Sequence, residues 1–202
     1  MLVELGGGTN PHPRADVVID LTRPKNSPPQ DAANTPWQSE FHPAAPDKDH
    51  SGRWNLASGS VDEVYCSHFM EHIPSGQPRL NVMNEAWRVL KPGGTFTMIM
   101  PLIGYTNPFT GEPLSNQIGW QPWADPTHVS FWWLPESVWY FCEGPFKPHA
   151  DYGMEIWGPC GVYVTPEEAT ATIQSGRSAA GGAQSFWSVR DQWEGVVRIF
   201  KP

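Results

Sequence analysis

The sequence contains little cysteine, and what it has is not arranged for cross-linking. Three cysteines occur in 202 residues, Cys66, Cys142 and Cys160, far apart and in no paired spacing. This pattern argues against a disulfide framework and against a cysteine zinc site. Buried free thiols suit a reducing compartment, so we expect a cytoplasmic protein.

Long apolar runs and an excess of positive charge are missing as well. No stretch approaches the roughly 20 apolar residues that a membrane span needs, and no signal peptide is visible, because the chain reaches Glu4 at once. The 13 Lys and Arg residues face 21 Asp and Glu residues, a net charge of −8. Affinity for nucleic acid comes largely from Lys and Arg, so we expect neither a membrane nor a nucleic-acid partner.

Proline, glycine and tryptophan are abundant. There are 22 prolines and 19 glycines, which together stay below the roughly 25–30% share typical of disordered chains. A chain of 202 residues suits one domain. We therefore expect one loop-rich globular domain with no internal repeat.

The first stretch carries a binding pattern. An apolar run, Leu2–Leu5, ends in a glycine cluster, and a second, Val17–Leu21, contains Asp20 near its end. Glycines at a strand end allow ligand contact with bare main chain, and an acid closing the next parallel strand can hold ribose hydroxyls. A dinucleotide fingerprint fits poorly, because Pro11 stands where its third glycine belongs. The cluster could also be a simple tight turn.

The link between these two runs is too short for a normal crossover. It extends from residue 6 to residue 16 and contains Pro11 and Pro13. A parallel crossover usually takes a dozen or more residues with a helix, and proline disfavours a helix interior. We expect the usual first helix to be absent or reduced to a turn.

The middle of the chain predicts an α/β unit. Residues 61–66 read as a strand, and apolar positions from Gln77 to Leu90 recur at helical spacing. Lys91–Gly94 then stops the helix before a buried strand over 95–100.

The remaining segments are less regular. Residues 23–54 are rich in proline, with a weak third-strand signal near 53–56, and 102–159 hold six of the eleven tryptophans with a short helix over 135–142. The tryptophans could pack a small core or wall an acceptor pocket. Residues 165–184 predict a mobile loop, and 186–193 with 195–200 predict an antiparallel edge.

Three ordered blocks resemble class I (Rossmann-like) S-adenosylmethionine-dependent methyltransferases. They are Glu4-x-Gly-x-Gly-x-Asn10, the run Asp62–Ile73, and Asn84–Gly94 ending in Arg-Val-Leu-Lys-Pro-Gly-Gly. The chain is most similar to a small branch that also lacks the first helix. The resemblance implies an α/β fold with a mainly parallel sheet, an antiparallel C-terminal edge and a loop-rich aromatic cap. It also implies one domain, with a cofactor half (1–101), a cap (102–160) and C-terminal strands (161–202).

The resemblance also implies a cofactor, S-adenosylmethionine, and the residues that bind it. The methionine end would be framed near the opening glycines, the ribose would meet an acid, and the methyl group would lie past the fourth strand. These positions are Glu4, Gly6, Gly8 and Asn10, then Asp20, then Ser67 and His68.

The catalytic candidates are His68 and the pair Asp125 and His128 in Asp-Pro-Thr-His. Methyl transfer depends mainly on holding donor and acceptor in line, and a base helps only when the acceptor must lose a proton. The alternative is that Asp125 and His128 bond only to their own loop backbone.

One competing motif remains. His68-x-x-Glu71-His72 matches the metal motif of inverted zinc peptidases, although Pro74 and Gly76 interrupt any long helix there. We expect no metal ligand. The function predicted is methyl transfer to a small-molecule acceptor. The alternatives are a non-catalytic binding module of the same fold and, third, a zinc hydrolase. The N-terminal edge is expected to be open, for a second copy or another partner to cover.

Overall fold

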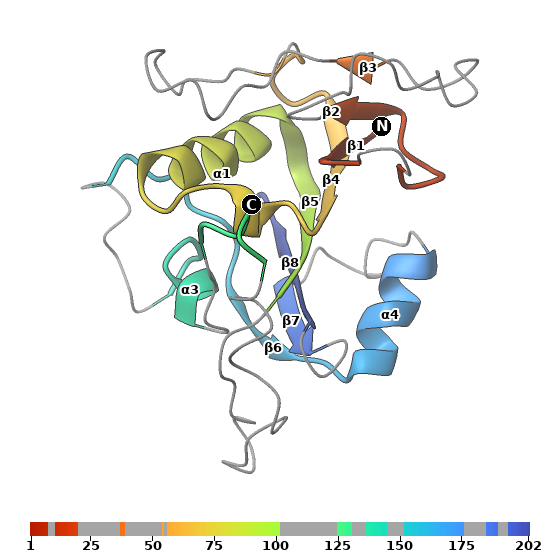
Figure 1. Ribbon diagram of the computed structural model, residues 1–202, viewed down its shortest axis with the longest axis vertical. Coiled ribbons are helices and arrows are strands. Elements are labelled where there is room, and N and C mark those ends of the chain that lie inside the picture. Colours follow the sequence, from red (N-terminus) through yellow and green to blue (C-terminus); the bar gives the residue numbers. More distant parts are fainter. Residues whose placement is uncertain are drawn as a thin grey trace.

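The computed structural model describes residues 1–7, 11–19, 37–38, 54, 56–101, 125–130, 136–144, 152–175, 185–189 and 194–202. These residues form one eight-stranded sheet with helices beside it (Figure 1). The strands are β1 (Leu2–Leu5), β2 (Val17–Ile19), β3 (Trp37–Gln38), β4 (Val61–Ser67), β5 (Leu90–Pro101), β6 (Cys160–Tyr163), β7 (Ser185–Val189) and β8 (Glu194–Phe200). The helices are η1 (Met70–His72, a 3-10 turn), α1 (Gln77–Val89), α3 (Glu136–Trp139) and α4 (Pro166–Ser175).

The strand order is β3-β2-β1-β4-β5-β8-β7-β6. Strands β3, β2, β1, β4 and β5 are parallel to their neighbours, whereas β8 is antiparallel to both β5 and β7. The first five strands thus follow the doubly wound order 3-2-1-4-5, whose switch point lies between β1 and β4. This confirms the predicted α/β fold with a mainly parallel sheet and an antiparallel C-terminal part.

The predicted helix over 77–90 is confirmed as α1. Its buried face consists of Val82, Met83, Ala86 and Val89, at the spacing that the apolar pattern predicted, with Pro78 tolerated in the first turn. The helix ends before Lys91 as expected. The next strand begins earlier than expected, because Leu90 already pairs with Val61 across β4 and a register shift follows.

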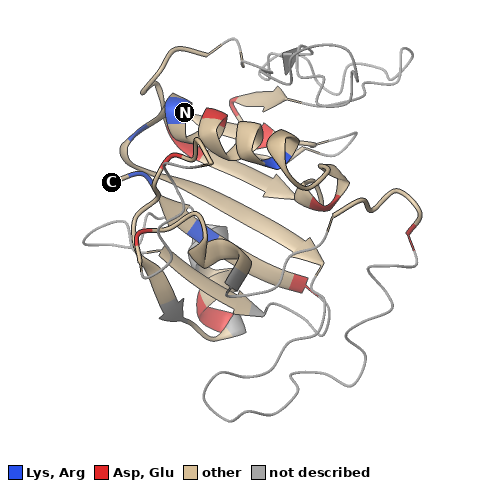
Figure 2. Ribbon diagram, turned by 90° about the vertical axis from the view of Figure 1, so that its left-hand side faces the viewer, with Lys and Arg blue, Asp and Glu red and all other residues tan. Residues whose placement is uncertain are grey.

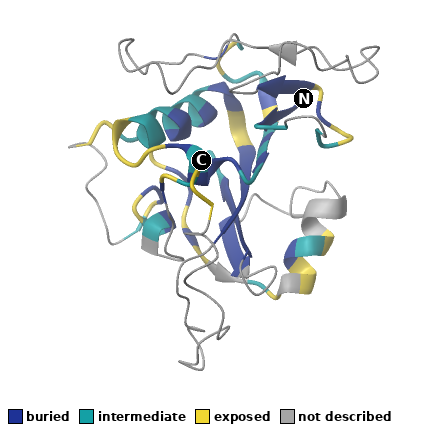
Figure 3. Cartoon of the chain, viewed as in Figure 1, coloured by how far each residue is buried: buried dark blue, intermediate teal, exposed yellow. Residues whose placement is uncertain are grey.

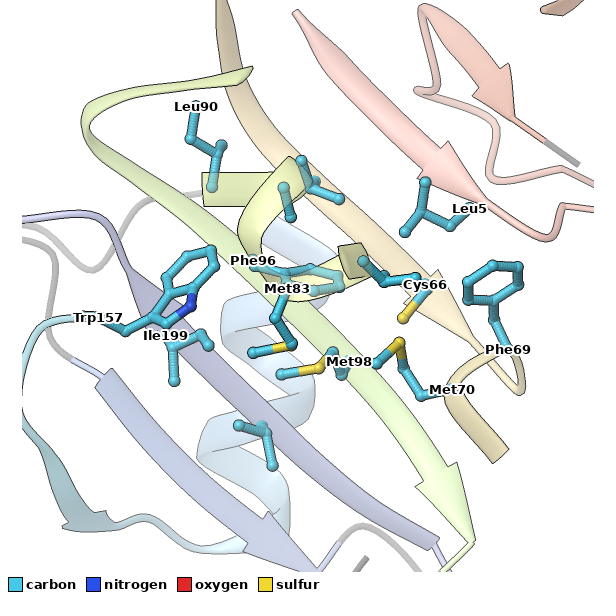
Figure 4. Packing of buried hydrophobic residues seen from close by; sticks show 14 of the residues in the cluster. Leu5, Cys66, Phe69, Met70, Met83, Leu90, Phe96, Met98, Trp157 and Ile199 are labelled. Carbon is cyan, nitrogen blue, oxygen red and sulfur yellow. The ribbon is translucent and has the colours of Figure 1, made fainter. Parts of the chain in front are cut away.

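The core lies between α1 and the central strands (Figures 3 and 4). Met83 on α1, Phe96 on β5 and Cys66 on β4 are fully buried. Trp157, from the segment predicted as an aromatic cap, is also fully buried, with its ring 6.0 Å from that of Phe96 between centroids. This tryptophan therefore packs the core; most of the predicted cap lies outside the described residues.

The loop predicted over 165–184 is wrong in its first half, where α4 forms over Pro166–Ser175. Thr165 and Glu168 bond each other's main chain: the Thr165 N–H donates to Glu168 Oε2 (2.9 Å), and the Glu168 N–H donates to Thr165 Oγ1 (3.3 Å). This is a capping box, with Pro166 in the favourable first helical position. Residues 176–184 lie outside the described part.

Two further strand predictions need correction. The third strand is β3 at Trp37–Gln38, not near 53–56, and β6 was not predicted at all. In the described part of the link between β1 and β2, residues 11–16 contain a turn and no helix. The predicted short helix over 135–142 is present as α3, only four residues long. None of the helices described is both long and apolar enough to cross a membrane.

Candidate functional site

The ends of β1 and β4 meet closely at the switch point of the sheet. Gly6 directly follows β1, has a φ of +71° and donates its N–H to Ile19 O (2.8 Å) at the end of β2. A Cβ at Gly6 would lie 2.5 Å from Phe69 Cδ2, in the chain just after β4. Glycine is needed here for both its conformation and its size.

Glu4 supports the same corner from below. This strand residue is only 5% exposed, and its Oε2 accepts the main-chain N–H of His12 at 2.6 Å. A Cβ at Gly7 would lie 2.9 Å from that oxygen. The carboxylate therefore fixes the course of the link towards β2. Gly8, Asn10 and Asp20, the other predicted cofactor residues on this side, lie outside the described residues.

Ser67 and His68 lie where β4 ends. Ser67 pairs with Ile99 of β5, and the His68 N–H donates to Ile99 O (2.9 Å). His68 has a φ of 53°, a conformation that few residues other than glycine adopt and that often marks functional sites. Both residues thus stand at the carboxyl end of the strand, as predicted.

The imidazole of His68 lies between two carboxylates. Its Nε2 is 2.9 Å from Glu194 Oε1, and its Nδ1 is 3.2 Å from Glu71 Oε1. The hydrogen bond with Glu194, and next the contact with Glu71, raise the pKa of His68 to about 9 against its partial burial. The ring is therefore an imidazolium near neutral pH, which suits positioning better than proton abstraction.

Glu71 is the centre of this group. Its side chain is 2% exposed, and within the described residues neither carboxylate oxygen makes a hydrogen bond of normal geometry. The 3.2 Å approach to His68 is close enough for an ion pair but not aligned as a hydrogen bond. Oε1 is also 4.0 Å from Nε2 of His128.

The segment 125–130 is held against η1 by main-chain bonds. The N–H groups of Val129 and Ser130 both donate to Glu71 O (2.9 and 3.0 Å), and Ser130 Oγ donates to Met70 O (3.0 Å). These bonds bring His128 beside His72, with ring centroids 5.0 Å apart.

Asp125 has two different roles at its two oxygens. Oδ1 accepts the N–H and the hydroxyl of Thr127 (2.8 and 2.6 Å), and these bonds hold the pKa of Asp125 below its usual value. Oδ2 is 3.6 Å from His128 Nε2. The backbone-bonding alternative therefore describes one oxygen, while the other faces the predicted partner. The structure brings His68, Asp125 and His128 together around Glu71; their catalytic role stays a prediction.

Sequence reasoning did not assign a role to Glu194 and considered Glu71 only in a zinc motif. Glu194 is a buried acid opening an otherwise apolar strand, 8% exposed. An acid at the start of an apolar strand is a usable signal, but its pairing with His68, 126 positions away, is not visible in the sequence.

The zinc-hydrolase alternative is not supported. Its motif needs His68 and His72 on one helical face, but η1 contains only Met70–His72, and His68 precedes it with a positive φ. Both ring nitrogens of His68 instead face carboxylates.

Comparisons with known proteins agree with the predicted family. Residues 42–98, less than half of the chain, match a family model described as a methyltransferase domain. No curated protein matches the sequence significantly.

Solved structures with some likeness are methyltransferases or of related kind. They include the YcgJ protein of Bacillus subtilis (17% identity, 69% of this chain, 58% of that chain, TM-score 0.45). A SAM dependent methyltransferase from Archaeoglobus fulgidus has 12% identity, 99% and 85% coverage and a TM-score of 0.48. Haemonchus contortus phosphoethanolamine N-methyltransferase 2, solved with S-adenosyl-L-methionine, has 12% identity, 100% and 48% coverage and a TM-score of 0.48.

The chain spans little more than half of the first of these proteins and about half of the third. All three TM-scores are below 0.5, so the fold is established by the strand order of the chain itself. The methyltransferase-domain match over residues 42–98 confirms the resemblance to class I methyltransferases that the motifs predicted.

Proposed function

We propose that this chain is an S-adenosylmethionine-dependent methyltransferase that acts on a small-molecule acceptor. One observation carries the proposal: at the switch point of a doubly wound sheet, Gly6 and the residues after β4 converge within a methyltransferase-type unit. Ligands of open α/β sheets bind outside the carboxyl ends of the strands at this point.

The described residues fit the cofactor. Gly6 and Gly7 leave bare main chain at the end of β1, where a Cβ would collide with Phe69 or Glu4. Glu4, Gly6, Ser67 and His68 would bind it together with Gly8, Asn10 and Asp20, which only the sequence suggests. When bound, the cofactor supplies an activated methyl group; the chain holds it and excludes other geometries.

The acceptor side would be formed by His68, Asp125 and His128. The cluster around Glu71 holds these side chains between η1 and segment 125–130, next to the end of β4. His68, clamped by Glu71 and Glu194, would act as a positioning residue. His128, with Asp125 Oδ2 beside it, is the candidate to accept a proton if the acceptor must lose one.

The charge distribution favours a small acceptor over nucleic acid. The described Lys and Arg residues lie on separate elements (Figure 2), and three of them are paired with carboxylates. The pairs are Arg14–Glu63, Arg88–Glu85 and Lys91–Asp62. Little unpaired positive charge is then left for a phosphate backbone in the described part.

The test is calorimetric titration of the purified protein with S-adenosylhomocysteine. We expect saturable binding, weakened about 10- to 100-fold in Asp20→Ala, because hydrogen bonds to a charged group contribute roughly 1.5–3 kcal/mol. The matched control is Asp62→Ala, at the opposite end of β4, where an exposed ion pair with Lys91 contributes little.

No binding at millimolar ligand would overturn the proposal. Binding without consumption of S-adenosylmethionine across small acceptors that bear hydroxyl, amine, thiol or carboxylate groups would instead support the non-catalytic binding module.

A further inference from the structure

We propose that Glu71, His72 and His128 bind one divalent transition-metal ion beside the cofactor crevice. Each of these residues offers a ligand atom, and the three atoms lie within 4.8 Å of one another. The ligands come from two segments, η1 and 125–130, far apart in the sequence.

The first supporting observation is the orientation of His72. Its Nδ1 lies 3.2 Å from the main-chain oxygen of Thr127. A carbonyl can only accept, so Nδ1 carries the proton and the lone pair is on Nε2. Histidines that bind metals usually donate their other N–H to a carbonyl or carboxylate in this way, which fixes the tautomer and the ring.

The second observation is the buried carboxylate of Glu71. Both of its oxygens lack a well-formed hydrogen bond within the described residues, although the side chain is 2% exposed. A buried carboxylate without full compensation is costly. His68 contacts only Oε1. A cation held jointly by Glu71 and His128 would provide the compensation that Oε2 lacks.

The third observation is the rigidity of the arrangement. Two main-chain bonds from Val129 and Ser130 to Glu71 O place His128 next to η1 independently of any side chain. The rings of His72 and His128 meet edge to face at 5.0 Å. Asp125 Oδ2, 3.6 Å from His128 Nε2, is a further oxygen on the same side. Small side-chain rotations suffice to bring three ligands to one ion.

The donor set indicates the class of metal. Two imidazoles and one carboxylate suit zinc and other first-row divalent ions, whereas magnesium prefers oxygen ligands alone. Three protein ligands leave a coordination position for water or a substrate oxygen. This ligand set differs from the hydrolase motif, because His68 is not part of it and His128 is.

The proposal does not rest on the methyltransferase assignment, but it would change one role within it. An ion on Nε2 of His128 would make that residue a ligand, so His128 could not accept a proton from a methyl acceptor. Glu71, in turn, would be the residue shared between the ion and His68.

The experiment uses untagged, chelator-treated protein titrated with zinc chloride by calorimetry and with cobalt(II) chloride by visible absorption. We expect one ion per chain and a cobalt spectrum typical of nitrogen and oxygen ligands. His72→Ala and His128→Ala should each weaken binding at least tenfold, and Glu71→Gln should do the same. His12→Ala, which removes a histidine whose ring lies against Tyr65 instead, is the matched control and should bind like the parent.

The melting temperature of each metal-free variant, followed by circular dichroism, separates lost ligands from lost fold. If Glu71→Gln does not fold, the two histidine variants carry the test. Absence of zinc binding at millimolar concentration, or binding unchanged in both histidine variants, would overturn the proposal. Asp20→Ala should keep metal binding while it loses S-adenosylhomocysteine, so failure of one proposal is distinguishable from failure of the other.

Discussion

Gly6 shows how much one residue contributes to the corner where β1 and β4 meet. We expect Gly6→Ala to lower the free energy of unfolding by about 2 kcal/mol or more. The left-handed backbone costs a residue with a Cβ roughly 1–2 kcal/mol, and the added carbon would press on Phe69. Urea unfolding measures the change.

Gly161→Ala is the control for that substitution. A Cβ at Gly161, in strand β6, would meet no atom within 4 Å. Its free energy of unfolding should stay within about 0.5 kcal/mol of the parent value. Equal effects at both positions would contradict the close approach of Phe69 to Gly6.

His68 gives a pH-dependent contribution to stability. Its pKa is raised from 6.5 to about 9 by Glu194 and Glu71, so the folded state holds the proton more tightly than the unfolded chain does. The stabilisation is complete below about pH 6.5 and is lost as the pH rises through about 9. We expect the stability difference between the metal-free parent protein and His68→Gln to shrink between pH 6 and pH 9.5.

Urea unfolding at several pH values checks this, and the ring can be followed by NMR. A difference that grows with rising pH would contradict the clamp between two carboxylates. His12→Gln serves as a control, because burial lowers the pKa of His12 and its contribution has the opposite sign.

At the scale of an element, α4 depends on its first turn. We expect Thr165→Ala to cost about 1 kcal/mol, the usual effect of losing an N-cap side chain, since Thr165 Oγ1 accepts the Glu168 N–H. Thr170→Ala, at a half-buried position within the same helix, should cost less, because alanine is the better helix former and this gain offsets the lost methyl group. Thermal unfolding compares the two. Equal losses would mean that the capping box contributes nothing.

The elements that were predictable are those set by local pattern. Helix α1 follows from its apolar spacing and its Lys-Pro-Gly-Gly stop, and β4 and β5 follow from β-branched runs. Helix α4 was missed because its alanine, threonine and glutamine content resembles a loop, although the Thr165–Glu168 box was present in the sequence. Strand β3 has two residues, too few for any periodicity, and forms because β2 offers an edge.

The site was predictable only in part for the same reason. His68, Asp125 and His128 could be selected by their position in motifs, and the structure brings them together. The pairing of His68 with Glu194 depends on β8 folding back beside β5, a contact across most of the chain. No local pattern records such a contact.

At the scale of the whole molecule, β8 joins the two parts of the sheet. Ile199 is fully buried in the main core, so Ile199→Ala should lower the free energy of unfolding by about 2–4 kcal/mol. Ile156→Ala, at a position 44% exposed, should change it by less than about 0.5 kcal/mol. Guanidinium unfolding of the two variants measures the contrast, and similar losses would contradict the interior position of β8.

The place of β8 between β5 and β7 also has a consequence for synthesis of the chain. A nascent polypeptide emerges from its N-terminus, so β5, complete at Pro101, is made long before its neighbour, which begins at Glu194. Until then one side of a twelve-residue, largely apolar strand offers unpaired main-chain groups, which favour pairing with other chains. Translation that stalls between these two points should therefore yield aggregates, and a chaperone that covers strand edges should be most needed in that interval.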